Sequence, residues 1–230
     1  MIDAAADQIC AIGRRAYSRG LVAGMEGNIS VRLDERRVLC TPTMHCKGTL
    51  TPADLCLIDL EGRRLEGARK PSSEMPMHLA AYAADAGVRA VVHLHPPYAT
   101  TFAVLGESVP TGHLPEAEIF FGAVPLVPYA TTGTPAMGEV LRPFVREHCV
   151  ALLQNHGAVS WAVDLERAYC LIESLEAVCR VVHQARQIGT PREIAAEKRR
   201  ELADLRVRVR ESMRQPTAPA STGARWQALE

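Results

Sequence analysis

Residues 90–100 read AVVHLHPPYAT, a short apolar strand that ends in two histidines and two prolines. Side chains two residues apart on a strand project from the same face, so we expect His93 and His95 to point to one side. Two neutral imidazoles on one face provide half of a tetrahedral metal site. A lone His-x-His is a weak signal, and two histidines with unrelated hydrogen bonds are the simpler interpretation.

A third histidine follows another apolar strand. Residues 150–153 are Val-Ala-Leu-Leu, and the turn Gln-Asn-His-Gly follows at residues 154–157. We expect Gly157 to permit a tight or positive-φ turn that aims His156 back over the sheet. Sites in open α/β sheets gather at strand ends, and three histidines without a fourth protein ligand leave one metal position open. This pattern is typical of a catalytic metal rather than a structural one.

Residues 71–74, Pro-Ser-Ser-Glu, are predicted to open a helix. The hydroxyls of Ser72 and Ser73, together with free N–H groups at a helix start, can hold a phosphate. Glu74 is the acid–base candidate, although a carboxylate in a first turn is commonly only a partner of the helix dipole. His78, one turn later, could orient that carboxylate or simply pack the helix.

Along the rest of the chain, helical and extended periodicities alternate, which predicts an α/β domain over residues 1–213. Helices are expected at residues 3–19, 71–86, 134–147, 164–187 and 192–213, and strands at 28–32, 37–40, 54–60, 89–95 and 150–153. Residues 214–230 are rich in Pro, Ala, Ser and Thr, which predicts a mobile C-terminal tail.

The bulk properties limit the partners. The 230 residues carry 26 basic and 26 acidic side chains, so no net charge favours nucleic acid or an anionic membrane. No apolar run is long enough to span a bilayer. Seven scattered cysteines without a Cys-x-x-Cys pair indicate reduced thiols in a cytoplasm rather than a disulfide framework.

Six stretches together resemble the class II aldolase and adducin-head family. They are GLVAGMEGNISVR (20–32), TPT (41–43), PSSEMPMHLAAY (71–82), AVVHLHPPYAT (90–100), VPYATTGT (127–134) and LLQNHGAVSWAVDLERAY (152–169). They cover most of residues 10–185 in the family's order, and order with spacing is more specific than any one motif.

The resemblance implies a three-layer α/β fold with a central, mainly antiparallel sheet and helices on both faces. It implies a divalent metal on His93, His95 and His156, with Zn²⁺ first and Co²⁺, Mn²⁺ or Fe²⁺ as alternatives. The family's catalytic glutamate matches Glu74. Positions that bind the substrate phosphate match Gly27, Asn28, Thr43, Ser72 and Ser73. A homotetramer with sites near its interfaces is also implied.

The reaction implied is the cleavage of a ketose 1-phosphate of the fuculose, 5-deoxyribulose or 5-methylthioribulose type. Its products would be dihydroxyacetone phosphate and an aldehyde. A dehydratase or decarboxylase on the same metal site is the main alternative. Aspartate is usual at the position of Glu74 in the related 4-epimerases, and adducin-like interaction domains lose the histidines, so both are weaker alternatives.

The chain departs from the fuculose-phosphate aldolases near the expected substrate. Met25 replaces a small or hydroxyl residue and Met44 a glycine, which could soften the pocket for a deoxy or thioether aldehyde or reflect ordinary packing. In the loop that contains His45, Lys47 could supply a cation for phosphate or be a solvated lysine. Leu114 stands where a proton-donating tyrosine is expected, and His113, Glu116 or Glu118 could substitute for it.

Overall fold

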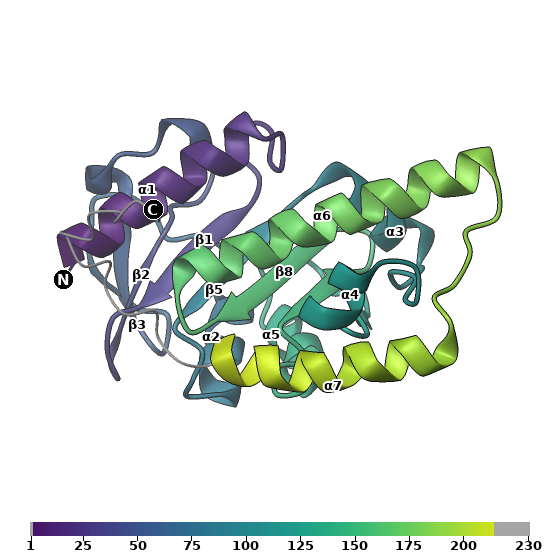
Figure 1. The fold of residues 1–230 in the computed structure, drawn as a ribbon. Helices are drawn as coiled ribbons and strands as arrows, with labels where there is room; N and C mark the ends of the chain where they lie inside the picture. Colours follow the sequence, from purple (N-terminus) through teal and green to yellow (C-terminus); the bar gives the residue numbers. More distant parts are fainter. Residues whose placement is uncertain (1, 214–230) are drawn as a thin grey trace, which may run out of the picture.

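The computed structural model describes residues 2–213, which fold around one eight-stranded sheet (Figure 1). The strand order is β4-β3-β2-β1-β5-β8-β7-β6, and every neighbouring pair is antiparallel except β6 and β7. The strands are β1 (Asn28–Arg32), β2 (Arg37–Cys40), β3 (Cys56–Asp59), β4 (Arg64–Glu66), β5 (Ala90–Leu94), β6 (Leu126–Val127), β7 (Val150–Leu153) and β8 (Gly157–Ala162). The mainly antiparallel sheet that the resemblance implied is therefore confirmed.

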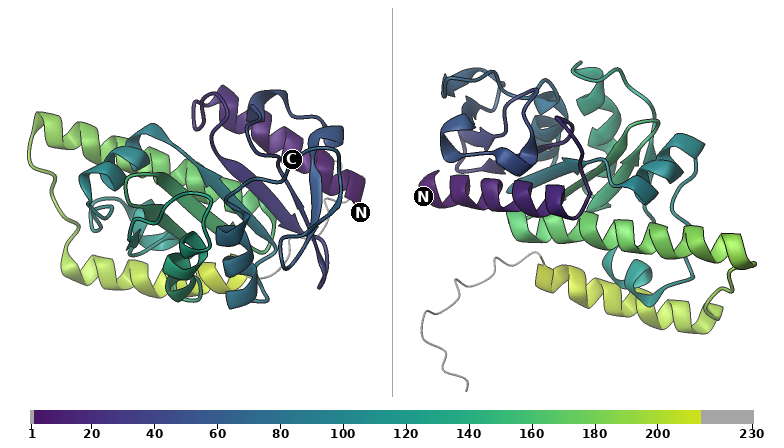
Figure 2. Two further views of the ribbon diagram at one scale, coloured as in Figure 1. Left: turned by 180° about the vertical axis from the view of Figure 1, so that it is seen from behind. Right: turned by 90° about the horizontal axis from the view of Figure 1, so that it is seen from above.

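Helices cover both faces of this sheet (Figures 1 and 2). The α-helices are α1 (Ile2–Ser18), α2 (Met75–Ala84), α3 (Pro97–Leu105), α4 (Pro115–Phe120), α5 (Ala136–Leu141), α6 (Leu165–Ile188) and α7 (Ala196–Met213). Helices α1, α3 and α6 share one apolar core with the sheet, whereas α2 and α5 share a second core with its other face. Helix α7 packs against α4 at the outside of the first layer.

The alternation of side chains on β5 determines where the site lies. Ala90, Val92 and Leu94 enter the core beneath α6, and Val91 enters the core beneath α2. His93 has the same parity as Val91 and therefore faces the α2 layer. Strand β5 ends at Leu94, so His95 follows on the same side just beyond the strand.

Most of the predicted elements are confirmed, but three helices are shorter than expected. Helix α7 begins at Ala196 rather than at residue 192. Helix α2 begins at Met75 because Pro71 forms a β-bridge with Pro42, and the Ser72 N–H donates to the Thr41 carbonyl. Helix α5 ends at Leu141 and continues only as a 3₁₀ turn over Arg142–Phe144. Proline at residue 143 cannot donate a helical hydrogen bond, which is consistent with the early end of this helix.

The strand predicted at residues 54–60 is also shorter, because two 3₁₀ turns, Lys47–Thr49 and Pro52–Asp54, precede β3. Asp54 closes a capping box with Thr51 instead of entering the sheet. The sequence did not predict β4, β6, β8, α3 or α4. Each of these five elements is nine residues long or shorter, too short for periodicity to stand out.

The predicted tail, residues 214–230, lies outside the described residues. Among residues 2–213, no helix combines the length and apolar character that crossing a bilayer requires. All seven cysteines are free thiols.

Candidate metal centre

The three predicted histidines meet above the ends of β5 and β7. Their nitrogen atoms lie within 4.8 Å of one another, and the Nε2 atoms of His93 and His95 are 3.1 Å apart. Two nitrogens bound to one tetrahedral zinc would be separated by about 3.4 Å. His93 is fully buried, whereas His95 and His156 remain partly exposed, so the cluster has an inner wall and an open side.

Two residues of the turn after β7 bring His156 to the other histidines. Asn155, not Gly157, has the positive φ of 55° that turns the chain, a conformation that asparagine tolerates well. Gly157 is required for a different reason. A Cβ there would lie 2.7 Å from the Leu94 carbonyl oxygen and 2.8 Å from the His95 ring, so only glycine allows this close approach. The turn was therefore predicted correctly, but its positive φ belongs to Asn155 and not to Gly157.

Outer hydrogen bonds determine which nitrogens face the centre. His93 Nδ1 lies 2.9 Å from the Ala158 carbonyl, which can only accept, so Nδ1 carries the proton. His95 Nδ1 lies 3.4 Å from Glu26 Oε2 and takes the same tautomer. The two Nε2 lone pairs then converge, an arrangement that favours a shared cation. Burial keeps the pKa of both histidines below its usual value, so both stay neutral.

Glu74 adds a carboxylate to this cluster. Its Oε1 lies 3.2 Å from His156 Nε2, and its Oε2 lies 3.3 Å from His93 Nε2. Burial alone would raise the pKa of the Glu74 carboxyl, but the hydrogen bonds from His156 and Asn28 outweigh it and lower that pKa. Three imidazoles and an ionised carboxylate form a donor set that fits a divalent cation.

Asn28 and His78 take unexpected positions around Glu74. The Asn28 amide donates to Glu74 Oε2 at 2.6 Å, and its oxygen lies 2.6 Å from His78 Nε2. His78 therefore meets Glu74 only through Asn28. The Asn28 side chain is 3% exposed and already has partners for its oxygen and one N–H. Its amide nitrogen therefore binds Glu74, and only its second N–H is left to donate to a phosphate.

A hollow of about 150 Å³ opens beside this carboxylate. All five residues that the resemblance assigned to phosphate line it, namely Gly27, Asn28, Thr43, Ser72 and Ser73. Glu74 and His95 line the same hollow, so the polar residues and the candidate metal centre share one space. Among them, the Ser72 hydroxyl accepts a hydrogen bond from the Glu74 N–H at 3.3 Å.

The loops around this hollow contain the two methionines that differ from the residues expected in the fuculose-phosphate aldolases. Met25 and Met44 line it and are 52% and 71% exposed, so neither is an ordinary packing residue in this chain. Met44 has a φ of 54°, the left-handed conformation that favours glycine, which is the residue that the resemblance led us to expect at this position. The large side chain therefore stands at the mouth despite a backbone cost of about 1 kcal/mol.

Lys47 is not the solvated lysine that the sequence suggested. It is 1% exposed, and its ammonium donates to the carbonyls of Met25, at 3.0 Å, and of His45. Burial lowers the pKa of Lys47 to about 8, despite the opposing negative charges of Glu26 and Glu74. Lys47 therefore connects the two loops that carry the methionines rather than facing the hollow.

The residues proposed to replace the missing tyrosine lie elsewhere. Leu114 precedes α4 and packs against the core beneath α6. His113 Nδ1 lies 3.2 Å from the Arg192 carbonyl, and the buried Glu118 accepts from the Gly112 N–H at 2.6 Å. Neither side chain contacts the histidine cluster in this chain. Glu26, which no motif in the sequence indicated, is the additional carboxylate at the centre.

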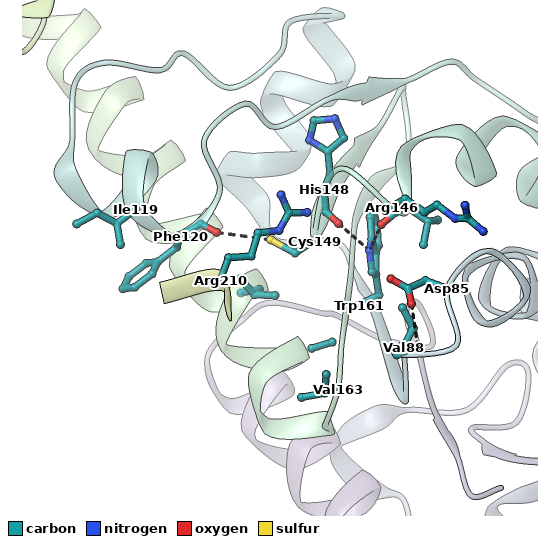
Figure 3. A pocket seen from close by; sticks show the side chains of 14 residues that line it. Asp85, Val88, Ile119, Phe120, Arg146, His148, Cys149, Trp161, Val163 and Arg210 are labelled. Carbon is teal, nitrogen blue, oxygen red and sulfur yellow. Dashed lines mark hydrogen bonds between the residues drawn. The ribbon is translucent and has the colours of Figure 1, made fainter. Parts of the chain in front are cut away.

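A second cavity lies away from this chemistry, where α4, the end of β8 and the end of α7 meet (Figure 3). Its volume is about 290 Å³, and its lining is mostly apolar, with Trp161, Phe120 and Leu171 among the side chains. The indole N–H of Trp161 donates to the carbonyls of Val145 and His148. No residue of the histidine cluster lines this cavity.

A three-histidine centre with a carboxylate, set at the strand ends of a mainly antiparallel sheet, is the arrangement of a metal-dependent enzyme. The family model described as class II aldolase and adducin N-terminal domain matches residues 7–183. The chain belongs to this family.

Two curated relatives and one solved structure are similar over most of the chain. A 5-deoxy-D-ribulose 1-phosphate aldolase of Bacillus thuringiensis serovar kurstaki is 33% identical over 199 residues, 86% of this chain and 92% of the relative. A 3-oxo-tetronate 4-phosphate decarboxylase of Haemophilus influenzae is 36% identical, with 74% and 82% covered. The structure of an L-fuculose 1-phosphate aldolase superposes with a TM-score of 0.80 at 28% identity, covering 87% of this chain and 94% of that one.

Proposed function

We propose that this protein is a divalent-metal-dependent aldolase that cleaves a ketose 1-phosphate into dihydroxyacetone phosphate and an aldehyde. One observation carries the proposal: the hollow lined by Thr43, Ser72 and Ser73 opens directly onto Glu74 and His95. A phosphorylated end and a reacting carbonyl can therefore bind within one small space. The aldolases among the similar proteins support this reading.

The three histidines would hold the metal, and Zn²⁺ is the ion we propose, with Co²⁺, Mn²⁺ and Fe²⁺ as alternatives. A divalent cation at this place would polarise the substrate carbonyl and neutralise negative charge on its oxygen. His93 and His95 would present their Nε2 atoms to it because Ala158 and Glu26 occupy their other nitrogens.

Glu74 would move the proton at carbon. As the carbon–carbon bond breaks, the hydroxyl that becomes the aldehyde oxygen loses a proton, and the electron-rich carbon left on the phosphorylated fragment must gain one before that fragment leaves as dihydroxyacetone phosphate; the ionised Glu74 would take up the first proton and supply the second. Glu74 lies between His93 and His156 and lines the hollow, so its carboxyl group can reach a substrate carbon there. Hydroxyls of Thr43, Ser72 and Ser73 would hold the phosphate end.

The exposed methionines support a substrate with an apolar end. Met25 and Met44 stand at the mouth of the hollow, where a thioether could offer a hydroxyl only a weak acceptor. A 5-deoxy or 5-methylthio ketose 1-phosphate is therefore the substrate type we favour over fuculose 1-phosphate. The similarity to a 5-deoxyribulose 1-phosphate aldolase is consistent with this choice.

A decarboxylase on the same site is the second candidate, because a relative with 36% identity bears that name. It would need the same metal and the same phosphate hollow. Two further features of the proposed enzyme are a homotetrameric assembly, which the resemblance implies, and a cytoplasmic location, which the free cysteines favour.

The test is a coupled assay for dihydroxyacetone phosphate with metal-loaded protein and a panel of 5-deoxy, 5-methylthio and hydroxylated ketose 1-phosphates. We expect metal-dependent release with a preference for the deoxy or thioether sugars. Chelated protein is the control. Release of carbon dioxide from a 3-oxo-tetronate 4-phosphate, without any dihydroxyacetone phosphate from the panel, would favour the decarboxylase instead.

A further inference from the structure

A line of buried polar side chains leads away from Glu74 between β1 and α2. Asn28 and Ser30 are two residues apart on β1, and His78 and Tyr82 are four apart on α2, so each pair shares one face of its element. The two faces interdigitate in the order Glu74, Asn28, His78, Ser30, Tyr82. The four residues behind Glu74 are at most 3% exposed.

The distances connect every member of this line. Asn28 Nδ2 lies 2.6 Å from Glu74 Oε2, and Asn28 Oδ1 lies 2.6 Å from His78 Nε2. His78 Nδ1 lies 2.7 Å from the Ser30 oxygen, which lies 2.7 Å from the Tyr82 oxygen. These are four short hydrogen bonds without water access.

The chemistry of the groups fixes the direction of each bond. A carboxylate only accepts, so the Asn28 amide nitrogen faces Glu74 and its oxygen faces His78. His78 must then carry its proton on Nε2, which leaves Nδ1 to accept from the Ser30 hydroxyl. The Ser30 oxygen in turn accepts from the Tyr82 hydroxyl. All four bonds run toward the carboxylate, and bonds aligned in this way polarise one another.

Burial keeps the line in a single protonation state. It lowers the pKa of His78 to about 3 and raises the pKa of the Tyr82 hydroxyl, so the imidazole stays neutral and the phenol stays protonated. The directions of the hydrogen bonds are therefore constant across the working range of an enzyme.

We propose that Tyr82, Ser30, His78 and Asn28 form a positioning chain that holds Glu74 Oε2 and leaves Oε1 as the oxygen that transfers the proton. This inference rests on the proposed role of Glu74 in the aldolase. The other polar side chains beside this carboxylate are the imidazoles of His93 and His156, which are the proposed metal ligands, so the Asn28 amide is the partner that can orient Glu74 Oε2 independently of the metal.

If this positioning chain orients Glu74, its variants should show a specific kinetic pattern. Replacing His78 by leucine leaves the Asn28 amide free to rotate, so Glu74 keeps its charge and loses its orientation. We expect kcat to fall by about 10- to 100-fold, with the KM and the metal dissociation constant unchanged within about threefold. His78→Gln retains an N–H donor near the Nε2 position and should recover part of the loss. Tyr82→Phe, at the far end, should cost less than His78→Leu.

Ser160→Ala is the matched control. Ser160 is equally buried, and it donates to the Ala168 carbonyl at 2.6 Å, so it takes no part in the positioning chain. It should lower the melting temperature without lowering kcat. The inference would be wrong if kcat fell in proportion to melting temperature across the two His78 variants, Tyr82→Phe and Ser160→Ala. It would also be wrong if the kcat of His78→Gln were no higher than that of His78→Leu, because either result would make the role of the positioning chain purely structural.

A second measurement separates this inference from the aldolase proposal. Nitrogen-15 NMR of the protein should show His78 as the neutral Nε2–H tautomer, with a proton protected from exchange, and Asn28→Ala should remove that protection. An Nδ1–H tautomer would overturn the chain whatever reaction is catalysed. A correct tautomer in a protein that releases no dihydroxyacetone phosphate would support the chain's geometry and contradict the aldolase.

Discussion

Two concave regions of this molecule differ in what converges on them. The cavity beside α7 is the larger, about 290 Å³ against about 150 Å³, yet its wall is mostly apolar (Figure 3). Beside the small hollow lies a cluster of three imidazoles and two carboxylates, each of which is within 3.4 Å of another member. Ionisable groups pay a desolvation cost to lie together, so their convergence indicates function more strongly than cavity volume does.

The largest effect should follow the loss of a metal ligand. His93→Ala leaves two imidazoles, so we expect the bound metal to be lost and turnover to fall by at least about 1,000-fold. His148→Ala, which removes a histidine from the lining of the apolar cavity, is the control. Metal content and dihydroxyacetone phosphate release measure both variants. A His93→Ala protein that cleaved substrate without metal would contradict the proposed site.

Glu74→Gln should come next. The amide cannot transfer the proton, and we expect turnover to fall by about 100- to 10,000-fold while the three histidines still bind the metal. Glu118→Gln is the matched control, because Glu118 is a buried carboxylate with a backbone partner. Turnover lost equally in the control would show that Glu118 also takes part in the reaction.

Glu26→Ala should have a smaller effect that appears first in metal affinity. Glu26 Oε2 lies beside His95 Nδ1, and outer partners of this kind typically change metal affinity by about 10- to 100-fold. We expect a loss near the lower end, since the Glu26 side chain is 35% exposed. Chelator competition measures it, with Glu107→Ala, an exposed carboxylate paired with Arg186, as control. If the metal affinity of Glu26→Ala were unchanged, Glu26 would have no role in holding the metal.

The same contrast explains what the sequence could predict. The spacing of His93 and His95 defines their common face, and strand alternation alone carries that prediction into the structure. The helix start at residues 71–74 already indicated Ser72, Ser73 and Glu74, and the family resemblance added the mainly antiparallel sheet and the hollow residues Gly27, Asn28 and Thr43. Neither source could predict Glu26, because its contact with His95 depends on how the chain bends between residue 20 and β1.

The role of Asn28 was hidden for a related reason. Its hydrogen bond to His78 could not be predicted from its sequence neighbours, because His78 lies 50 residues away along the polypeptide. Only the packing of α2 over β1 brings the two side chains together. Short elements such as α4 and β8 escaped prediction because their stability comes from tertiary contacts rather than local periodicity.

The smallest effect on turnover should come from the apolar cavity itself. Leu171 lines it from α6 and is 3% exposed, so Leu171→Ala removes buried contacts and enlarges the void. We expect the free energy of unfolding to fall by about 2–5 kcal/mol, measured by urea denaturation. Turnover per folded molecule and metal affinity should match the unmodified protein, the opposite of Glu74→Gln. A variant that kept its stability but lost turnover would mean that this cavity also serves the reaction.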